Sequence, residues 1–208
     1  MSPLEFIIYA VLVRRRMENH NMNYALIREN DIANGPGVRV SVFVSGCRHH
    51  CKGCFNPETW SFSYGHPFTD KTIESIIALA APSFVSGLSL LGGEPFEPEN
   101  QADLARLAKI FKSKYPQKTI WCYSGFTFEG DLLPKANKNE EHVKELLSAI
   151  DVLVDGKFVE DLKDSSLLFR GSSNQNIIDV KKSLSENKTV LLEGKWKRTV
   201  GSGNIYET

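Results

Sequence analysis

The feature of this sequence that most constrains its fold is an alternation of short apolar segments with longer amphipathic ones. The short segments have the composition of strands, and the longer ones carry apolar residues at helical spacing. We expect strands at residues 38–44, 87–91, 119–123 and 152–154, and helices at residues 69–81, 99–114 and 140–150. Such alternation is typical of an α/β fold with parallel strands and helices outside them. The chain is too short for a full eight-unit barrel of ~250 residues, so we expect an open, partial (β/α) barrel of parallel strands.

The least ordinary residues of the chain follow the ends of these strands. A cysteine-bearing loop comes after the first strand, and Gly92-Gly93-Glu94, Ser124-Gly125 and Asp155-Gly156 come after the next three. Right-handed crossovers place the carboxyl ends of parallel strands at the same edge of a sheet. We therefore expect all four segments to converge at the edge where α/β folds bind their ligands.

Charge and hydropathy exclude some classes of partner. The 25 basic residues balance the 25 acidic ones, so no net charge attracts the chain to nucleic acid. The apolar run at residues 4–13 is shorter than the ~20 residues that span a bilayer. Arginines follow this run instead of preceding it, unlike in a signal peptide. A membrane-surface anchor is the alternative interpretation of this run, and the favoured prediction is a cytoplasmic protein without a membrane segment.

The beginning of the chain differs in composition from the remainder. We expect residues 1–21 to be an extension outside the fold, with Met22 as an alternative start, and residues 22–208 to form a single domain.

Three of the four cysteines lie within eight residues, at Cys47, Cys51 and Cys54. This C-x3-C-x2-C spacing is too tight for a disulfide framework and indicates a metal or cluster in a reducing compartment. Three thiolates on a short loop can each bind one iron of a 4Fe–4S cluster, which leaves the fourth iron for another ligand. Structural zinc, with His49 or His50 as a fourth ligand, is the alternative, although no second cysteine pair completes a zinc ribbon. Otherwise we expect both histidines to be exposed loop residues.

Cys122 stands apart from the other cysteines, in the middle of a predicted strand. Free cysteine behaves as a small hydrophobic residue, so we expect Cys122 to be buried and to bind no metal.

The cysteine spacing after a first strand resembles the radical S-adenosylmethionine superfamily. The segments at residues 34–39, 45–47 and 51–56 and the stretch at residues 169–175 (FRGSSNQ) resemble more specifically the activating proteins of anaerobic (class III) ribonucleoside-triphosphate reductases. The resemblance runs from about Met22 to Lys188. Many superfamily members have an aromatic residue just before the third cysteine, where this chain has Gly53.

The resemblance implies a set of cofactor contacts. Gly92, Gly93 and Glu94 would hold the methionine amino group of S-adenosylmethionine, because glycines permit close approach and a carboxylate accepts from an ammonium. Gly53, Cys54 and Phe55 would lie near the adenine, with Phe55 in place of the missing aromatic residue. Ser124 would bond a ribose hydroxyl or the carboxylate of the cofactor. Arg39 and Lys157 are further candidates for that carboxylate.

The resemblance also implies the reaction and its partners. An electron donor such as flavodoxin would reduce the cluster, S-adenosylmethionine would be cleaved, and the 5′-deoxyadenosyl radical would convert one glycine of the reductase to a glycyl radical. No catalytic residue beyond the cluster and cofactor is expected. The alternatives are an activator of another glycyl-radical enzyme, such as pyruvate formate-lyase, a different radical enzyme that acts on a small molecule, and a zinc-stabilised interaction module without catalytic activity. We expect the partner to bind within residues 157–200.

Overall fold

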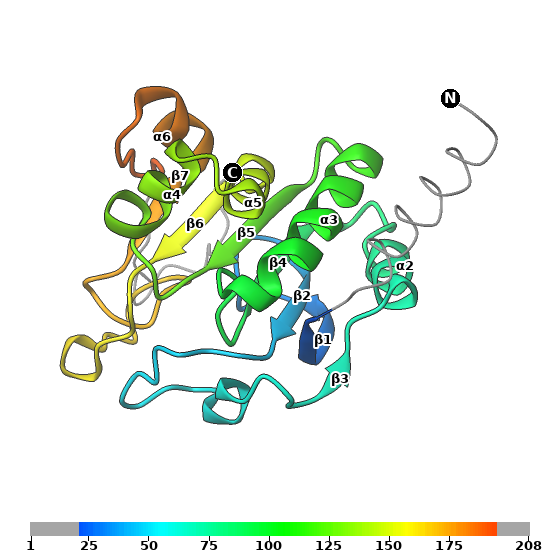
Figure 1. Ribbon diagram of the computed structural model, residues 1–208, viewed down its shortest axis with the longest axis horizontal. Helices are drawn as coiled ribbons and strands as arrows, with labels where there is room; N and C mark the ends of the chain where they lie inside the picture. Colours follow the sequence, from blue (N-terminus) through cyan, green and yellow to red (C-terminus); the bar gives the residue numbers. More distant parts are fainter. Residues whose placement is uncertain (1–20, 195–208) are drawn as a thin grey trace, which may run out of the picture.

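The computed structural model describes residues 21–194, which form a single mixed sheet with helices (Figure 1). The sheet has the strand order β3-β1-β2-β4-β5-β6-β7. Its strands are β1 (Asn23–Asp31), β2 (Val38–Val44), β3 (His66–Pro67), β4 (Val85–Gly92), β5 (Thr119–Tyr123), β6 (Val152–Asp155) and β7 (Asn176–Asp179). The α-helices are α2 (Asp70–Leu79), α3 (Pro98–Lys114), α4 (Leu133–Asn137), α5 (Glu141–Ala149) and α6 (Val180–Glu186). Single turns of other helix types are η1 (Pro57–Trp60), η2 (Phe128–Leu132) and η3 (Glu160–Leu162). Apart from residue 21, the predicted N-terminal extension lies outside the described residues.

The centre of the sheet is parallel, as the sequence predicts. Strands β2, β4, β5 and β6 pair in this order, with Val42 opposite Leu90, Leu90 opposite Cys122, and Cys122 opposite Leu153. The arrowheads of β2, β5 and β6 point toward the same side of the molecule (Figure 1). The loops after these strands therefore share one edge of the sheet.

The two faces of the sheet have different roles. One face carries fully buried apolar residues such as Val42, Leu90 and Ile120, which join side chains of the helices in the main hydrophobic core. Helices α2, α3 and α5 lie on this side of the sheet (Figure 1). Because side chains alternate along a strand, the neighbouring residues project from the other face. That face carries a smaller cluster around Trp121 and Val154 and the polar residue Arg39.

Arg39 is a structural residue of the sheet. Its side chain is fully buried, and its guanidinium donates to Ser89 Oγ at 2.7 Å and to the carbonyl oxygens of Leu88 and Thr119 at 2.8 and 2.9 Å. Burial lowers the pKa of Arg39 to about 10. The guanidinium is thus committed to strands β4 and β5, which leaves no role for it as a ligand of the cofactor's carboxylate.

The structure confirms the mixed α/β class and adds elements that the sequence pattern does not show. Strands β1 and β7 are antiparallel to their neighbours β2 and β6, so the prediction of a purely parallel sheet is wrong at both sides. Within residues 21–194 the sheet is open, with β3 and β7 at its two edges. Strand β7 and helix α6 lie in the region where the sequence shows no strand rhythm.

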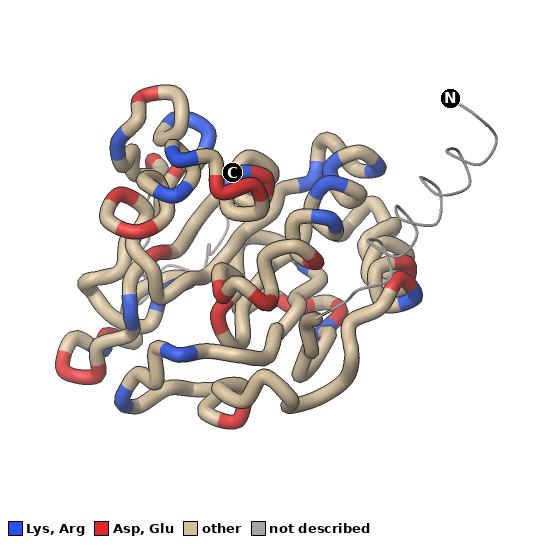
Figure 2. Tube along the Cα trace, viewed as in Figure 1, with Lys and Arg blue, Asp and Glu red and all other residues tan. Residues whose placement is uncertain are grey.

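The surface matches the balanced composition. Basic and acidic residues are interspersed along the described chain and do not separate onto different faces (Figure 2). No helix among residues 21–194 combines the length and the apolar character that a membrane crossing needs.

Candidate functional site

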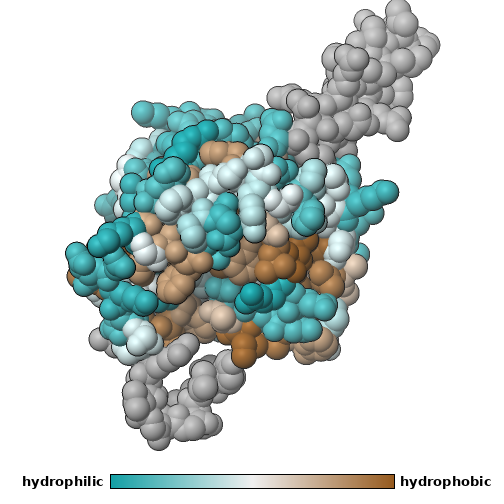
Figure 3. Space-filling view, turned by 90° about the horizontal axis from the view of Figure 1, so that it is seen from below, coloured by the Kyte–Doolittle hydropathy of each residue, from teal (hydrophilic) through white to brown (hydrophobic). Residues whose placement is uncertain are grey.

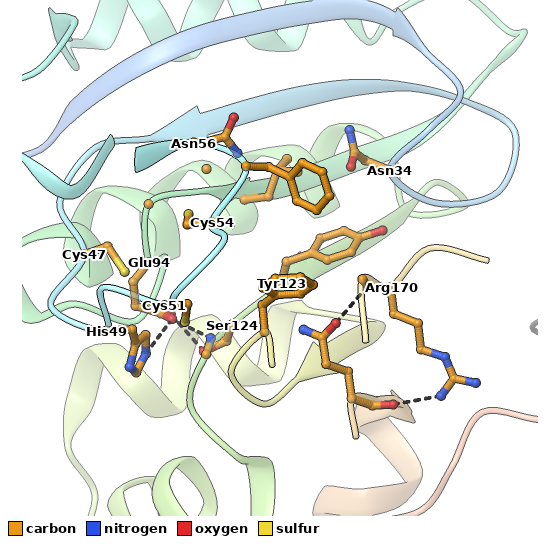
Figure 4. A pocket seen from close by; sticks show the side chains of 18 of the residues that line it. Asn34, Cys47, His49, Cys51, Cys54, Asn56, Glu94, Tyr123, Ser124 and Arg170 are labelled. Carbon is orange, nitrogen blue, oxygen red and sulfur yellow. Dashed lines mark hydrogen bonds and ion pairs between the residues drawn. The ribbon is translucent and has the colours of Figure 1, made fainter. Parts of the chain in front are cut away.

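One cavity of about 610 Å³ opens at the edge where the parallel strands end (Figure 4). Its walls come from the loops after β2, β4, β5 and β6, which is the convergence that the sequence predicts. Eight of the predicted site residues line it: Cys47, Cys51, Cys54, Phe55, Gly92, Gly93, Glu94 and Ser124. Gly53 is not among the lining residues, and its Cα faces Glu160 and Phe158 instead.

The cysteine loop is held by backbone hydrogen bonds as it leaves β2. The amides of Gly46 and Cys47 donate to the carbonyl oxygens of Thr59 and Trp60 at 2.8 and 3.1 Å. Gly46 has a φ of +94°, and a Cβ there would lie 2.3 Å from the ring of Phe62. Only glycine satisfies both conditions, so Gly46 directs the chain sharply into the loop.

The thiols of the loop lie in a partly buried environment. Burial, with the carboxylates of Glu94 and Glu97 nearby, raises the pKa of Cys47 to about 11, although the backbone amides of His49 and His50 donate to its sulfur. Burial also raises the pKa of Cys51, against a hydrogen bond from the backbone of Phe158. Burial thus favours the protonated thiols of Cys47 and Cys51, whose protons metal binding must displace.

The donor set fits an iron–sulfur cluster. Within residues 21–194, no three His, Cys, Asp or Glu side chains are gathered closely enough to hold one metal ion. Cys47, Cys51 and Cys54 instead lie at the same end of the cavity (Figure 4). Thiolates that bind separate irons of a cluster suit this arrangement, and the backbone amides directed at Cys47 and Cys51 support thiolate ligands.

The glycine pair after β4 lies directly against the cysteine loop. The amide of Glu94 donates to the carbonyl oxygen of Gly46 at 2.9 Å. A Cβ at Gly93 would lie 2.6 Å from that same oxygen, and Gly92 has a φ of +107°. The glycines at 92 and 93 are thus required for close contact between two backbone segments, in addition to any contact with a cofactor.

Glu94 is buried, with 1% of its surface exposed. Its carboxylate accepts four hydrogen bonds from other parts of the protein, two at each oxygen. An ionised carboxylate offers about four acceptor positions. An ammonium group would therefore have to displace a protein donor to reach this side chain.

The remaining predicted contacts differ in their surroundings. The Ser124 hydroxyl is buried and donates to Glu94 at 2.8 Å. Phe55 is 71% exposed, and its ring centroid lies 5.8 Å from that of Phe158. Lys157 is an exposed residue of the loop after β6. Cys122 is fully buried in the main core, as expected of a small hydrophobic residue.

The prediction that His49 is an exposed loop residue is wrong. Only 9% of its side chain is exposed, and its Nε2 lies 3.0 Å from a Glu94 carboxylate oxygen. His50 is exposed, and its ring stacks on that of Trp60 with a centroid separation of 4.6 Å. The position of His49 between two cysteines was the only sign in the sequence of its role.

Two further residues of the cavity, Tyr123 and Arg170, were not predicted from the sequence as site residues. Tyr123 projects across the middle of the cavity, and Arg170 lies at the end away from the cysteines (Figure 4). Burial raises the pKa of Tyr123 far above its ordinary value. Arg170 donates to the carbonyl oxygen of Gln175 at 2.7 Å. The sequence indicates a role for Arg170 only through its position in the stretch at residues 169–175.

Comparison with known proteins agrees with this site. The family model described as a 4Fe–4S single cluster domain matches residues 33–178. The anaerobic ribonucleoside-triphosphate reductase-activating protein of Escherichia coli (strain K12) is 44% identical over 156 residues, which cover 74% of this chain and 96% of the relative. The Vibrio cholerae protein of the same name is 42% identical over 158 residues, covering 75% and 97%. That of Enterobacteria phage T4 is 37% identical over 156 residues, covering 75% and 93%.

These relatives match three quarters of this chain and nearly all of their own length. The family model covers the cysteine loop and strands β2, β4, β5 and β6. The chain belongs to the family of anaerobic ribonucleoside-triphosphate reductase-activating proteins.

Proposed function

We propose that this chain is a radical S-adenosylmethionine oxidoreductase of the cytoplasm that generates a glycyl radical on anaerobic ribonucleoside-triphosphate reductase. The observation that carries the proposal is the shared cavity of Cys47, Cys51 and Cys54 and the Gly92–Glu94 segment in a chain of this family. When bound, the cluster and S-adenosylmethionine supply the reductive bond cleavage and the radical that removes a hydrogen from glycine.

The residues of the chain hold and orient these groups. Cys47, Cys51 and Cys54 would each bind one iron and leave the fourth iron facing the cavity. The segment with Gly92 and Gly93 would contact the amino group of the cofactor mainly through its backbone, since the Glu94 carboxylate already has four donors. The exposed ring of Phe55 is available to stack on adenine.

The open edge of the sheet suits a substrate that is a loop of another protein. We interpret the sheet as an open, partial (β/α) barrel, whose inner face is the one opposite the helices. A peptide can enter such a site from the side, whereas a closed barrel would shield the cofactor. An electron donor such as flavodoxin would approach the cysteine loop from outside.

Anaerobic reconstitution with iron and sulfide, followed by reduction with dithionite, tests the reaction. We expect release of 5′-deoxyadenosine from S-adenosylmethionine, and a glycyl radical signal when the reductase subunit is added. Protein that holds one zinc ion and cleaves no S-adenosylmethionine would overturn the proposal in favour of an interaction module. Cleavage without radical transfer to the reductase, but with transfer to pyruvate formate-lyase, would change only the partner.

Exposed apolar side chains at or next in the chain to residues that line the cavity form a surface at its mouth that suits a protein partner. Phe55, Val159 and Leu162 are 71%, 37% and 44% exposed, and the loops that bear them are joined by an ion pair of 3.0 Å between Lys52 and Glu160. Hydrophobic surface also lies between hydrophilic patches on the side of the molecule seen from below (Figure 3). Exposed apolar clusters often mark interaction sites.

We expect Leu162→Asp to weaken activation of the reductase by about tenfold or more, because a buried charge in an interface is costly. Cleavage of S-adenosylmethionine in the absence of the reductase should not change. Phe84→Asp is the matched control. Phe84 is 62% exposed, but it directly precedes β4 and therefore lies at the amino end of the parallel strands, opposite the cavity. Equal activation by the two variants would argue against binding at the mouth of the cavity.

A further inference from the structure

The Glu94 carboxylate connects the loops that follow three strands of the sheet. One oxygen accepts from the amide of Phe96 and the hydroxyl of Ser124, both at 2.8 Å. The other accepts from the amide of Gly125 at 2.7 Å and from His49 Nε2 at 3.0 Å. Phe96 belongs to the loop after β4, Ser124 and Gly125 to the loop after β5, and His49 to the cysteine loop after β2. A single buried carboxylate therefore fixes three segments relative to one another (Figure 4).

His49 is the side chain through which the cysteine loop contacts this carboxylate. Because a carboxylate only accepts, Nε2 carries the hydrogen in this contact. The ring also packs on Phe126, with centroids 4.5 Å apart. A Cβ at Gly125 would lie 2.4 Å from the ring, so the absence of a side chain there makes room for the imidazole.

His49 lies between two of the cysteines. It follows Cys47 by two residues and precedes Cys51 by two, while its imidazole bonds to Glu94. One residue thus links the cysteine loop to the segment that begins with Gly92 and Gly93. A displacement of this residue would shift the cysteine loop and the glycine segment relative to each other.

We propose that His49 is a positioning residue that holds the cysteine loop in register with the segment at residues 92–94 through Glu94. The inference rests on the proposed function, because S-adenosylmethionine must contact the cluster and this glycine segment at the same time. The register between the two segments then sets the affinity for the cofactor. The three cysteines alone are sufficient to assemble the cluster.

The neighbours of His49 contribute differently. Arg48 pairs with Glu97 and Glu99, but 57% of its side chain is exposed, so solvent weakens these ion pairs. His50 is exposed, and its ring stacks on that of Trp60 in η1 instead of contacting Glu94. His50 is therefore a matched control: it is the same residue type, also lies between Cys47 and Cys51, and contacts a different part of the chain.

The experiment compares His49→Ala, His49→Gln and His50→Ala with the wild-type chain after anaerobic reconstitution. The iron content of each protein is measured first. The dissociation constant for S-adenosylmethionine is then obtained from the change that the cofactor causes in the electron paramagnetic resonance spectrum of the reduced cluster. Thermal unfolding of the iron-free proteins reports on the fold itself.

We expect His49→Ala to keep its iron and to bind S-adenosylmethionine about tenfold to a hundredfold more weakly, as is usual when a residue that supports a metal site is removed. His49→Gln should regain most of the affinity, because its amide N–H can still donate to Glu94. His50→Ala should bind as the wild type does. If His49 served folding alone, His49→Ala would unfold at a lower temperature than the wild type. His49→Gln would then fail to restore the spectral response to S-adenosylmethionine.

Equal cofactor affinity in His49→Ala and His50→Ala would overturn the inference while leaving the proposed function intact. Loss of iron from His49→Ala to the extent seen in Cys47→Ala would also overturn it, since the histidine would then be needed for the cluster itself. Wild-type protein that holds iron but shows no spectral response to S-adenosylmethionine would overturn the proposed function and this inference with it.

Discussion

Cys47→Ala, Cys51→Ala and Cys54→Ala are each expected to abolish assembly of a stable cluster. Each substitution removes one of the three proposed protein ligands, and the cavity offers no other cysteine, since Cys122 is fully buried in the core. Iron content after reconstitution should fall from about four atoms per chain to a small fraction of that value. Release of 5′-deoxyadenosine should disappear with the iron.

The matched control for these variants is Cys122→Ala. This substitution removes one sulfur atom from the packing of β5 in the main core and should cost about 1 kcal/mol of unfolding free energy. Iron content and cofactor cleavage should stay near the wild-type values. Loss of the cluster in Cys122→Ala, together with its retention in Cys54→Ala, would show that the ligands are assigned incorrectly.

Gly93→Ala is expected to weaken both the fold and the binding of the cofactor. Its Cβ would lie 2.6 Å from the carbonyl oxygen of Gly46 and 3.0 Å from that of Thr59. Both are backbone atoms, which cannot rotate away as a side chain can. We expect unfolding free energy to fall by about 1–3 kcal/mol, the usual range for overpacking. We also expect cofactor affinity to fall by at least about tenfold, because Gly46 directly precedes Cys47.

Gly130→Ala provides the comparison for this effect. A Cβ at Gly130 would come within 2.7 Å of the Thr127 hydroxyl, which belongs to a side chain that can rotate. Denaturant unfolding and titration with S-adenosylmethionine would measure stability and affinity for both variants. If Gly93→Ala unfolded and bound the cofactor as Gly130→Ala does, the close contact between the two backbone segments would not matter for the site.

The central part of the fold is predictable from local sequence patterns. The predicted strands at residues 38–44 and 119–123 coincide with β2 and β5, because β-branched and aromatic residues mark them clearly. Helix α2 begins after Thr69, whose side chain accepts from the amide of Thr72 in a capping box. These signals are local, so the sequence contains them in full.

The antiparallel strands on either side of the parallel centre are not predictable in the same way. Strand β1 is a nine-residue segment with mostly polar or exposed positions, and β7 has only four residues. Both are held by antiparallel backbone hydrogen bonds to a neighbour. Backbone pairing leaves no periodic pattern of side chains, which is why these strands and the mixed direction of the sheet were missed.

The candidate site likewise has features that the sequence predicts and features that it does not. The meeting of the cysteine loop with Gly92, Gly93 and Ser124 follows from the common direction of the strands, and the cavity confirms it. The burial of His49 follows from a contact with Glu94, which is 45 residues away in the chain. A polar residue in a glycine- and cysteine-rich loop has no local feature that predicts such a partner.

The backbone bonds that hold the cysteine loop have a consequence for the chain after damage by oxygen. Ser45, Gly46 and Cys47 donate to carbonyl oxygens of Asn23, Thr59 and Trp60, and none of these bonds involves sulfur or metal. Zinc fingers, in contrast, unfold when their metal leaves. We therefore expect the loop to keep its path when iron is lost, so that an oxidised chain that has been reduced again would be a folded acceptor for a new cluster. Repair then requires only the delivery of iron and sulfide, without a second round of folding.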